Sequence, residues 1–222
     1  MTEQQIPKLV ASLVEHQNAF SQLSVEDGQW AIQNTVEAIS LFVTALANRA
    51  KQVVEKLLEM LGTIKVPATI FKFIAREKFV VDTSDSAEVK ISYLGENFKR
   101  WFLGKIEEPM AEQTLRYAKL RMNSKDPGII TELGGNAKAE TTLAEMFAVL
   151  KRQGHGTSGA LLTNGWANIF YILDQSGVRR TVCAGWGGDG WGVYAGEVSY
   201  PCAWGGGDRV FSRKPFETQV TA

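Results

Sequence analysis

The glycine and tryptophan residues of this chain are crowded into one part of the sequence. Of its 21 glycines, 14 lie between Gly154 and Gly207, and so do four of its six tryptophans. Between Thr181 and Gly207 the only charged residues are Asp189 and Glu197. Glycine weakens helices, whereas tryptophan is enriched in strands. We therefore expect a C-terminal part of short strands and turns, and a different architecture for the first 150 residues, which are rich in Ala, Leu, Glu, Lys and Gln.

The first 66 residues carry a helical pattern. Ser24 is followed three residues later by Asp27, a hydroxyl-and-carboxylate spacing found at helix starts. Apolar residues then recur every three or four positions up to Leu61, and Gly62 and Pro67 follow, as at a helix end. We expect residues 1–66 to form a helical segment that makes a hairpin, mediates homo-oligomerisation or binds a partner. An ordinary amphipathic core helix is the alternative.

The order of the elements after Pro67 predicts the fold class. The chain alternates or clusters β-formers, then shows helical periodicity, and then returns to short strands separated by Gly, Asp and Ser turns. This order is α+β and not a repeating β-α-β pattern. The expected strands are 79–83, 89–93, 168–173, 180–184, 191–198 and 209–213; the expected helices are 96–104, 109–122 and 136–150, the last capped by Asn136, with a turn at 126–128 and a hairpin turn at 175–177.

Most catalytic chemistries are not indicated. Gly185, Gly187 and Gly190 match a dinucleotide-binding fingerprint as text, but a strand-like segment follows where that motif needs a helix, so a glycine-rich β-turn is expected. Two histidines and two cysteines are too few for a multi-ligand zinc or iron–sulfur site, and a cysteine nucleophile would need one of those histidines as its base. His155 is expected in a solvated loop. The chain is therefore not predicted to be an enzyme, and no cofactor is expected.

Charge and hydropathy limit the partners. The 24 basic and 24 acidic residues give zero net charge, so there is no basic footprint for nucleic acid. No apolar run approaches the roughly 20 residues needed for a membrane span. The polar, acidic start is unlike a secretory signal, which favours a cytoplasmic location, with surface display left open.

The segment 191–198 has two unlike faces if it is a strand. Trp191, Val193 and Ala195 would point to one side, and Gly192, Tyr194 and Gly196 to the other. Tyr, Ser, Gly and Asp on loops above a rigid apolar scaffold are typical of recognition surfaces. A glycine-rich β-meander with a tryptophan core explains the composition equally well. The candidate ligand-binding residues are Gly185, Gly187, Asp189, Gly192, Tyr194, Gly196, Ser199, Tyr200, Cys202 and Asp208.

Several longer strings resemble one protein family. They are Phe79-Val-Val-Asp-Thr, Val89-Lys-Ile-Ser-Tyr-Leu-Gly, Asn97-Phe-Lys-Arg-Trp-Phe-Leu-Gly-Lys-Ile-Glu-Glu-Pro109, Ala139-Glu-Thr-Thr-Leu-Ala-Glu-Met-Phe147, Asn164-Gly-Trp-Ala-Asn-Ile-Phe-Tyr-Ile172 and Trp204-x-x-Gly-x-x-Val-Phe-Ser-Arg213. The family occurs in small-genome candidate-phylum bacteria, and the resemblance covers residues 71–214. Its members often end in Ser-Arg-Asn-Ser, whereas Lys214-Pro215 follows Ser-Arg here.

The resemblance implies a variable protein of a diversity-generating retroelement. Such proteins display residues diversified at adenines of AAC-type codons on a C-type-lectin-like scaffold, and they bind a ligand. The implied domains are a helical segment at 1–66 and a C-type-lectin-like domain at 67–222 with a variable region of about 183–208. The implied partner is a protein or carbohydrate ligand, and the two cysteines would be products of diversification.

One internal check of this resemblance is possible. Diversified AAC codons cannot encode Lys, Gln, Glu, Met or Trp. All of the following positions fall within the permitted set: Cys183, Ala184, Gly185, Gly187, Gly188, Asp189, Gly192, Tyr194, Gly196, Ser199, Tyr200, Cys202, Ala203, Gly205, Gly206 and Asp208. The interleaved tryptophans and Glu197 fall outside it, as framework residues should. Acidic residues are too sparse for a lectin-type calcium site. A structural or assembly protein of phage or cell-surface type is the alternative function.

Overall fold

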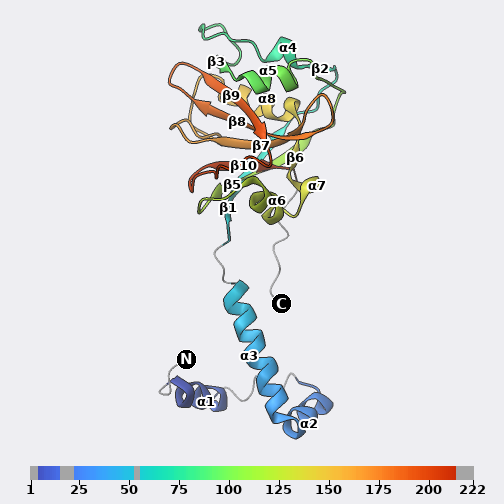
Figure 1. The fold of residues 1–222 in the computed structure, drawn as a ribbon, viewed down its shortest axis with the longest axis vertical. Helices are drawn as coiled ribbons and strands as arrows, with labels where there is room; N and C mark the ends of the chain where they lie inside the picture. The colour runs from blue at the N-terminus through green and yellow to red at the C-terminus, as the bar shows by residue number, and fades with distance from the viewer. Residues whose placement is uncertain (1–4, 16–22, 53–55, 214–222) are drawn as a thin grey trace. The chain divides into compact units, whose positions relative to one another are not determined.

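A computed structural model describes residues 5–15, 23–52 and 56–213 (Figure 1). The chain divides into two compact units, Met1–Val54 and Glu55–Ala222. The described part is mixed α+β, with eight helices and a large, mostly antiparallel sheet. None of the helices in the described ranges is long and apolar enough to cross a membrane.

The first unit contains helices α1 (Gln5–Glu15), α2 (Val25–Gln33) and α3 (Thr35–Gln52). Ser24 caps α2 as expected, since its hydroxyl accepts a hydrogen bond from the Asp27 backbone N–H at 3.0 Å. The expected continuous helix is interrupted at Asn34, the C-cap of α2. No residue of α2 is buried.

The expectation of a helix that continues to Leu61 is wrong. Leu58–Val66 forms strand β1, so the boundary between the units falls at Val54/Glu55 and not at residue 66. The strand is favoured by Thr63, Ile64 and Val66, whose β-branched side chains suit a pleated surface. The apolar spacing at Leu57 and Leu61 fitted a helix only by coincidence.

The expected helix at 109–122 is also wrong, because Gln113–Leu120 is strand β5. Leu115, Ala118 and Leu120 are buried there, and β5 pairs with β1 on one side and β10 (Arg209–Ser212) on the other. Ladder hydrogen bonds on both edges outweigh the local preference, since helix propensity is a weak prior in a packed protein.

Two further local expectations need correction. Residues 126–128 begin helix α6 (Asp126–Glu132), because proline at the first helical turn is pre-organised for a helix. Asn136 is the first residue of the short helix α7 (Asn136–Ala139), and it does not cap the longer one. Helix α8 (Leu143–Arg152) is capped by Thr142, whose hydroxyl and backbone N–H form a capping box with Glu145.

The C-terminal strands lie close to where the sequence predicts them. They are β7 (Asn168–Leu173), β8 (Arg179–Trp186), β9 (Trp191–Glu197) and β10. The eight-stranded sheet has the order β1-β5-β10-β7-β8-β9-β3, with β6 (Glu140–Thr141) on β7 and β3 (Ile91–Leu94) parallel to β9. A separate pair joins β2 (Phe73–Ile74) to β4 (Ile106–Glu107). The segment 79–83 contributes only the bridge from Asp82 to Ile91.

The two faces of the sheet carry separate apolar clusters. On β7, Phe170 and Ile172 belong to the larger cluster and Ile169 and Tyr171 to the smaller, as alternation along a strand requires. Helices α4 (Ala75–Lys78), α5 (Glu96–Phe102) and α8 lie over the larger cluster, and α6 and α7 lie on the other side (Figure 1). We call these the closed face and the open face.

Candidate functional site

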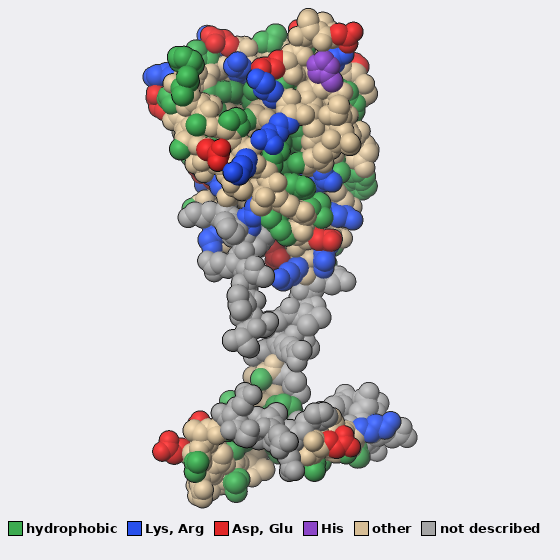
Figure 2. All heavy atoms as spheres, turned by 180° about the vertical axis from the view of Figure 1, so that it is seen from behind, with side chains coloured by type: hydrophobic (Ala, Val, Ile, Leu, Met, Phe, Trp, Pro, Cys, Tyr) green, Lys and Arg blue, Asp and Glu red, His purple; other side chains and the backbone are tan. Residues whose placement is uncertain are grey.

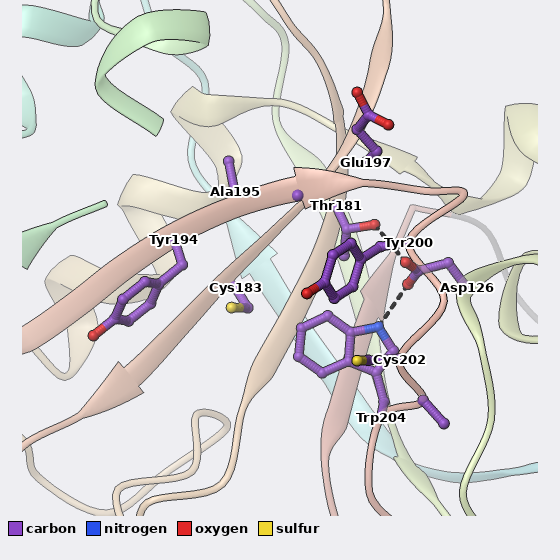
Figure 3. Close-up of a pocket in the computed structure, with 11 residues that line it drawn as sticks. Asp126, Thr181, Cys183, Tyr194, Ala195, Glu197, Tyr200, Cys202 and Trp204 are labelled. Atoms are coloured by element: carbon purple, nitrogen blue, oxygen red, sulfur yellow. Dashed lines mark hydrogen bonds between the residues drawn. The ribbon is translucent and has the colours of Figure 1, made fainter. Parts of the chain in front are cut away.

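A pocket of about 290 Å³ lies on the open face beside β8 and β9 (Figure 3). Its walls come from these two strands, from the loop after β9 and from the start of α6. The lining residues are Asp126, Thr181, Cys183, Tyr194, Ala195, Gly196, Glu197, Tyr200, Cys202, Ala203 and Trp204. Aromatic and small apolar side chains dominate, as is usual for ligand pockets.

The floor of the pocket is organised by Asp126. Its carboxylate accepts hydrogen bonds from Trp204 Nε1 at 2.7 Å and from the Thr181 hydroxyl at 2.9 Å (Figure 3). It also accepts one from the Tyr171 hydroxyl at 2.8 Å. Burial raises the pKa of Asp126, and the hydrogen bonds from Trp204, Tyr171 and Thr181 act against that rise. Burial also raises the pKa of Tyr171 above its usual range, with Asp126 contributing in the same direction. One buried carboxylate therefore ties α6, β7, β8 and the loop after β9 together.

Both cysteines line this pocket as free thiols. Cys183 is half-buried and Cys202 is exposed. Burial is the main reason that the pKa of Cys183 is raised to about 12, and Asp208 and Asp126 add to the rise. Cys183 is therefore a neutral thiol at neutral pH.

Asp208, one of the candidate ligand-binding residues, was expected to be exposed, but it is buried. Its side chain is 5% exposed, and its carboxylate accepts hydrogen bonds from the backbone N–H groups of Ala167 and Gly205, at 2.8 and 2.9 Å. Burial raises its pKa and these two bonds oppose the rise. Asp208 thus fixes the loop that carries Trp204, because it satisfies backbone groups that the turn leaves unpaired.

The pocket brings together four of the ten candidate residues: Tyr194, Gly196, Tyr200 and Cys202. Tyr194 and Tyr200 are 48% and 59% exposed, so both are accessible. Ser199 lines a shallower hollow nearby, together with Arg180 and Glu197.

The remaining candidates lie outside the pocket. Gly187 and Asp189 are exposed in the turn between β8 and β9, and Gly185 is half-buried on β8. Gly192 is buried, because the Tyr194 ring covers it: a Cβ there would lie 2.9 Å from Cε2 of that ring. The backbone N–H of Gly187 donates to the Gly190 carbonyl, so the dinucleotide-like string is a hairpin turn, as expected.

The glycines of this region differ in the space around them. A Cβ at Gly185 or Gly196 would meet nothing within 4 Å. At Gly190, by contrast, it would lie 2.8 Å from the Ser92 backbone nitrogen, and at Gly206 it would lie 3.0 Å from the Arg121 carbonyl oxygen. Strand positions beside the pocket can therefore accept larger side chains, whereas Gly190 and Gly206 are required by close backbone approach.

Sequence reasoning missed the residues that hold the pocket in place. Asp126 lies 55 residues before Thr181 and 78 residues before Trp204 in the sequence. No local spacing therefore links the three. The Asp-Pro-Gly string was the available signal, but it fits a turn as well as a helix start. Among the described residues there is no group of three or more His, Cys, Asp or Glu that could hold a metal ion.

The histidine weighed as a catalytic candidate has a backbone partner. Nε2 of His155 lies 2.8 Å from the Ala87 carbonyl oxygen. His155 is not among the residues that line the pocket. The functional groups that the pocket offers a ligand are therefore two thiols, two tyrosines and a tryptophan around a buried carboxylate.

Comparison with known proteins adds no relative. No protein family, curated protein or solved structure matches this chain.

Proposed function

We propose that this chain is a non-catalytic ligand-binding protein whose site is the pocket beside β8 and β9. The observation that carries the proposal is an overlap between the residues that line the pocket and the positions whose residues diversified AAC codons permit. Six of the eleven lining residues are among the positions whose residues a diversified AAC codon can encode: Cys183, Tyr194, Gly196, Tyr200, Cys202 and Ala203.

The division of roles among the lining residues supports the same proposal. Thr181 and Trp204 hydrogen-bond to Asp126, so each has a structural task. Tyr200 and Cys202 are exposed, and neither side chain makes a hydrogen bond to another described residue. A surface on which fixed residues hold variable ones suits recognition of a protein or carbohydrate ligand. The C-type-lectin-like identity of the scaffold is part of this proposal.

A pair of libraries tests the proposal. In the first, the six positions named above are randomised with codons derived from AAC; in the control, Asp126, Thr181 and Trp204 are randomised in the same way. We expect most members of the first library to resist protease, and the control library to lose folded members, because its changes leave buried polar groups unpaired. Folded members of the first library should yield binders to a chosen protein target. If the two libraries tolerate change equally, or the first yields no binder, the proposal fails.

The gene's surroundings give a second test. A retroelement origin requires a nearby reverse transcriptase and a template repeat that differs from codons 183–208 only at adenines. A neighbourhood without both would remove the diversification part of the proposal, whereas pocket binding would still stand on the library result.

A second candidate function, assembly of a larger structure, is favoured by the helical unit. Large apolar residues are exposed along α2 and α3, with Val25, Ile32 and Val36 between 77% and 86% exposed. Exposed apolar patches of this kind mark interaction sites. We infer that this unit mediates homo-oligomerisation. Light scattering should give a multiple of the chain mass for the full chain and a single chain mass for residues 55–222; a monomeric full chain contradicts this.

A further inference from the structure

The charge of the pocket is one-sided. Its lining includes the acids Asp126 and Glu197 but no Lys, Arg or His. Glu197 is exposed and pairs with Arg180 at 3.4 Å, so the buried negative charge in the lining is that of Asp126. The carboxylate of Asp126 accepts hydrogen bonds from a tyrosine, a threonine and a tryptophan, and that of Asp208 accepts them from backbone N–H groups. Neutral donors spread the charge of a carboxylate but do not cancel it. The two buried acids, Asp126 and Asp208, therefore give the pocket a negative potential when they are ionised.

The negative potential affects the pKa of the Cys183 thiol. Asp208 and Asp126 both disfavour its thiolate, in addition to the effect of burial. Arg179 and Arg180 precede the pocket residues on β8, and both have acidic partners. Arg179 pairs with Glu140 at 2.6 Å, and Arg180 pairs with Asp174 at 2.9 Å and with Glu197 at 3.4 Å. The Arg180 guanidinium also stacks 3.9 Å from the centre of the Trp101 ring.

The walls of the pocket suit a cation as well. Tyr194, Tyr200 and Trp204 line it, and in the view of Figure 3 the two tyrosine rings lie on either side of Cys183. An aromatic ring attracts a cation to its face, most strongly tryptophan, and the attraction grows where water is excluded. A hydrated metal ion would gain little from such walls, whereas an ammonium group with apolar substituents gains from both walls and charge.

We propose that the pocket binds the ammonium group of its ligand between Tyr194, Tyr200 and Trp204, with the carboxylate of Asp126 supplying the opposite charge. This rests on the proposed function and names the chemical class of the ligand. The ammonium group belongs either to a small quaternary amine or to a lysine side chain of a protein. A volume of about 290 Å³ accommodates either.

Two matched pairs of probes test the proposal on the full chain. Choline is compared with its uncharged carbon isostere 3,3-dimethylbutan-1-ol, and N-acetyl-lysine amide with its Nε-acetylated form, by calorimetric titration at neutral pH. We expect at least one cationic probe to bind about tenfold more tightly than its neutral partner. The pair with the larger ratio identifies the source of the ammonium group. Protection of the exposed Cys202 thiol from iodoacetamide by the bound probe locates the binding in the pocket.

An isosteric variant separates charge from shape. In Asp126→Asn the amide oxygen can still accept from Tyr171 and Trp204, and the amide nitrogen can donate to the Thr181 hydroxyl. We expect this variant to fold and to lose most of the preference for the cationic probe. Tyr200→Leu keeps an apolar wall and should weaken choline binding severalfold, whereas Glu108→Gln, an equal charge change at an exposed ion pair outside the pocket, should leave it unchanged.

Equal affinity for both members of each pair, cation binding that survives Asp126→Asn, or no binding of either cation up to 10 mM (roughly the limit of weak specific binding) would each overturn the ammonium proposal. The proposed function is tested separately by the libraries. If library members bind neutral or anionic targets through the pocket while both cations fail, the ammonium proposal falls and the ligand-binding function stands.

Discussion

The closed and open faces of the same sheet differ in what holds them together. On the closed face, Phe79, Phe98, Phe102 and Trp191 are buried in one continuous cluster under helices α4, α5 and α8. On the open face, the part beside β8 and β9 is bordered by Asp126 at the start of α6 and by the loop that carries Trp204. Apolar packing is intolerant of changes in volume, whereas an exposed rim is not. The difference explains how one strand, β9, can contribute to the packed core on one face and to the proposed ligand-binding site on the other.

Figure 2 shows the surface of the sheet unit from behind the view of Figure 1. Basic and acidic side chains are interspersed over that surface. Surface ion pairs contribute little to stability. In the pair of Lys72 with Glu108, at 2.7 Å, both side chains are exposed. The stability of the unit therefore rests on its two apolar clusters.

Truncation of a closed-face residue should have the largest effect. Trp191 is fully buried, its ring packs against Trp186 at 5.3 Å and its Nε1 donates to the Gln153 carbonyl at 3.1 Å. Trp191→Ala should lower the free energy of unfolding by about 3–5 kcal/mol. Urea denaturation followed by circular dichroism measures this. A loss below about 0.5 kcal/mol, the size typical of surface changes, would mean that the closed face is not the stabilising one.

Two glycine substitutions compare the faces at the level of the backbone. Gly190→Ser places a Cβ against the Ser92 backbone and should cost about 1–3 kcal/mol. Gly196→Ser enters open space beside the pocket and should change stability by less than about 0.5 kcal/mol. Denaturation midpoints of the two variants measure the contrast. Equal losses would contradict the conclusion that the pocket strands accept larger side chains.

The sequence predicts the strands β7, β8, β9 and β10 well, because alternation and glycine turns are local signals. Strands β1 and β5 were misread as helices, since their partners are each other and β10, and pairing between distant segments leaves no local trace. The residues of the pocket also differ in how far the sequence predicts them. Tyr194 and Tyr200 could be chosen from composition, but Asp126 could not, because its three partners lie 45 to 78 residues away.

Ionisation of Asp126 gives a smaller effect that depends on pH. Its pKa in the folded protein is raised, so the folded state holds the proton more tightly than the unfolded state does. The contribution of Asp126 to stability should therefore be fully present below the unfolded pKa of about 3.9 and should be lost as pH rises through the folded pKa. Asp126→Asn should remove this part of the slope. Tyr171 and Cys183, which face Asp126, have raised pKa values and stay neutral across this range.

The measurement is the unfolding free energy of the protein and of Asp126→Asn at intervals from pH 3 to 8. Asp208 also has a raised pKa and contributes the same sign, so the difference between the two proteins isolates Asp126. Two parallel curves would show that the Asp126 carboxyl is no more protonated in the folded than in the unfolded chain.

Removal of the two exposed pocket tyrosines should have the smallest effect on stability. Tyr200 is 59% exposed, and Tyr194 has one ring partner, Tyr93, at 5.4 Å. Tyr194→Ser combined with Tyr200→Ser should therefore change the unfolding free energy by about 1 kcal/mol or less, which is at most about a third of the loss expected for Trp191→Ala. Thermal unfolding followed by circular dichroism, with ligand titration on the same samples, checks both expectations. If the double variant binds as well as the original chain, the tyrosines are not contacts; if instead it unfolds like Trp191→Ala, the open face is as much a part of the packed core as the closed face, and the assembly function becomes the better account of this surface.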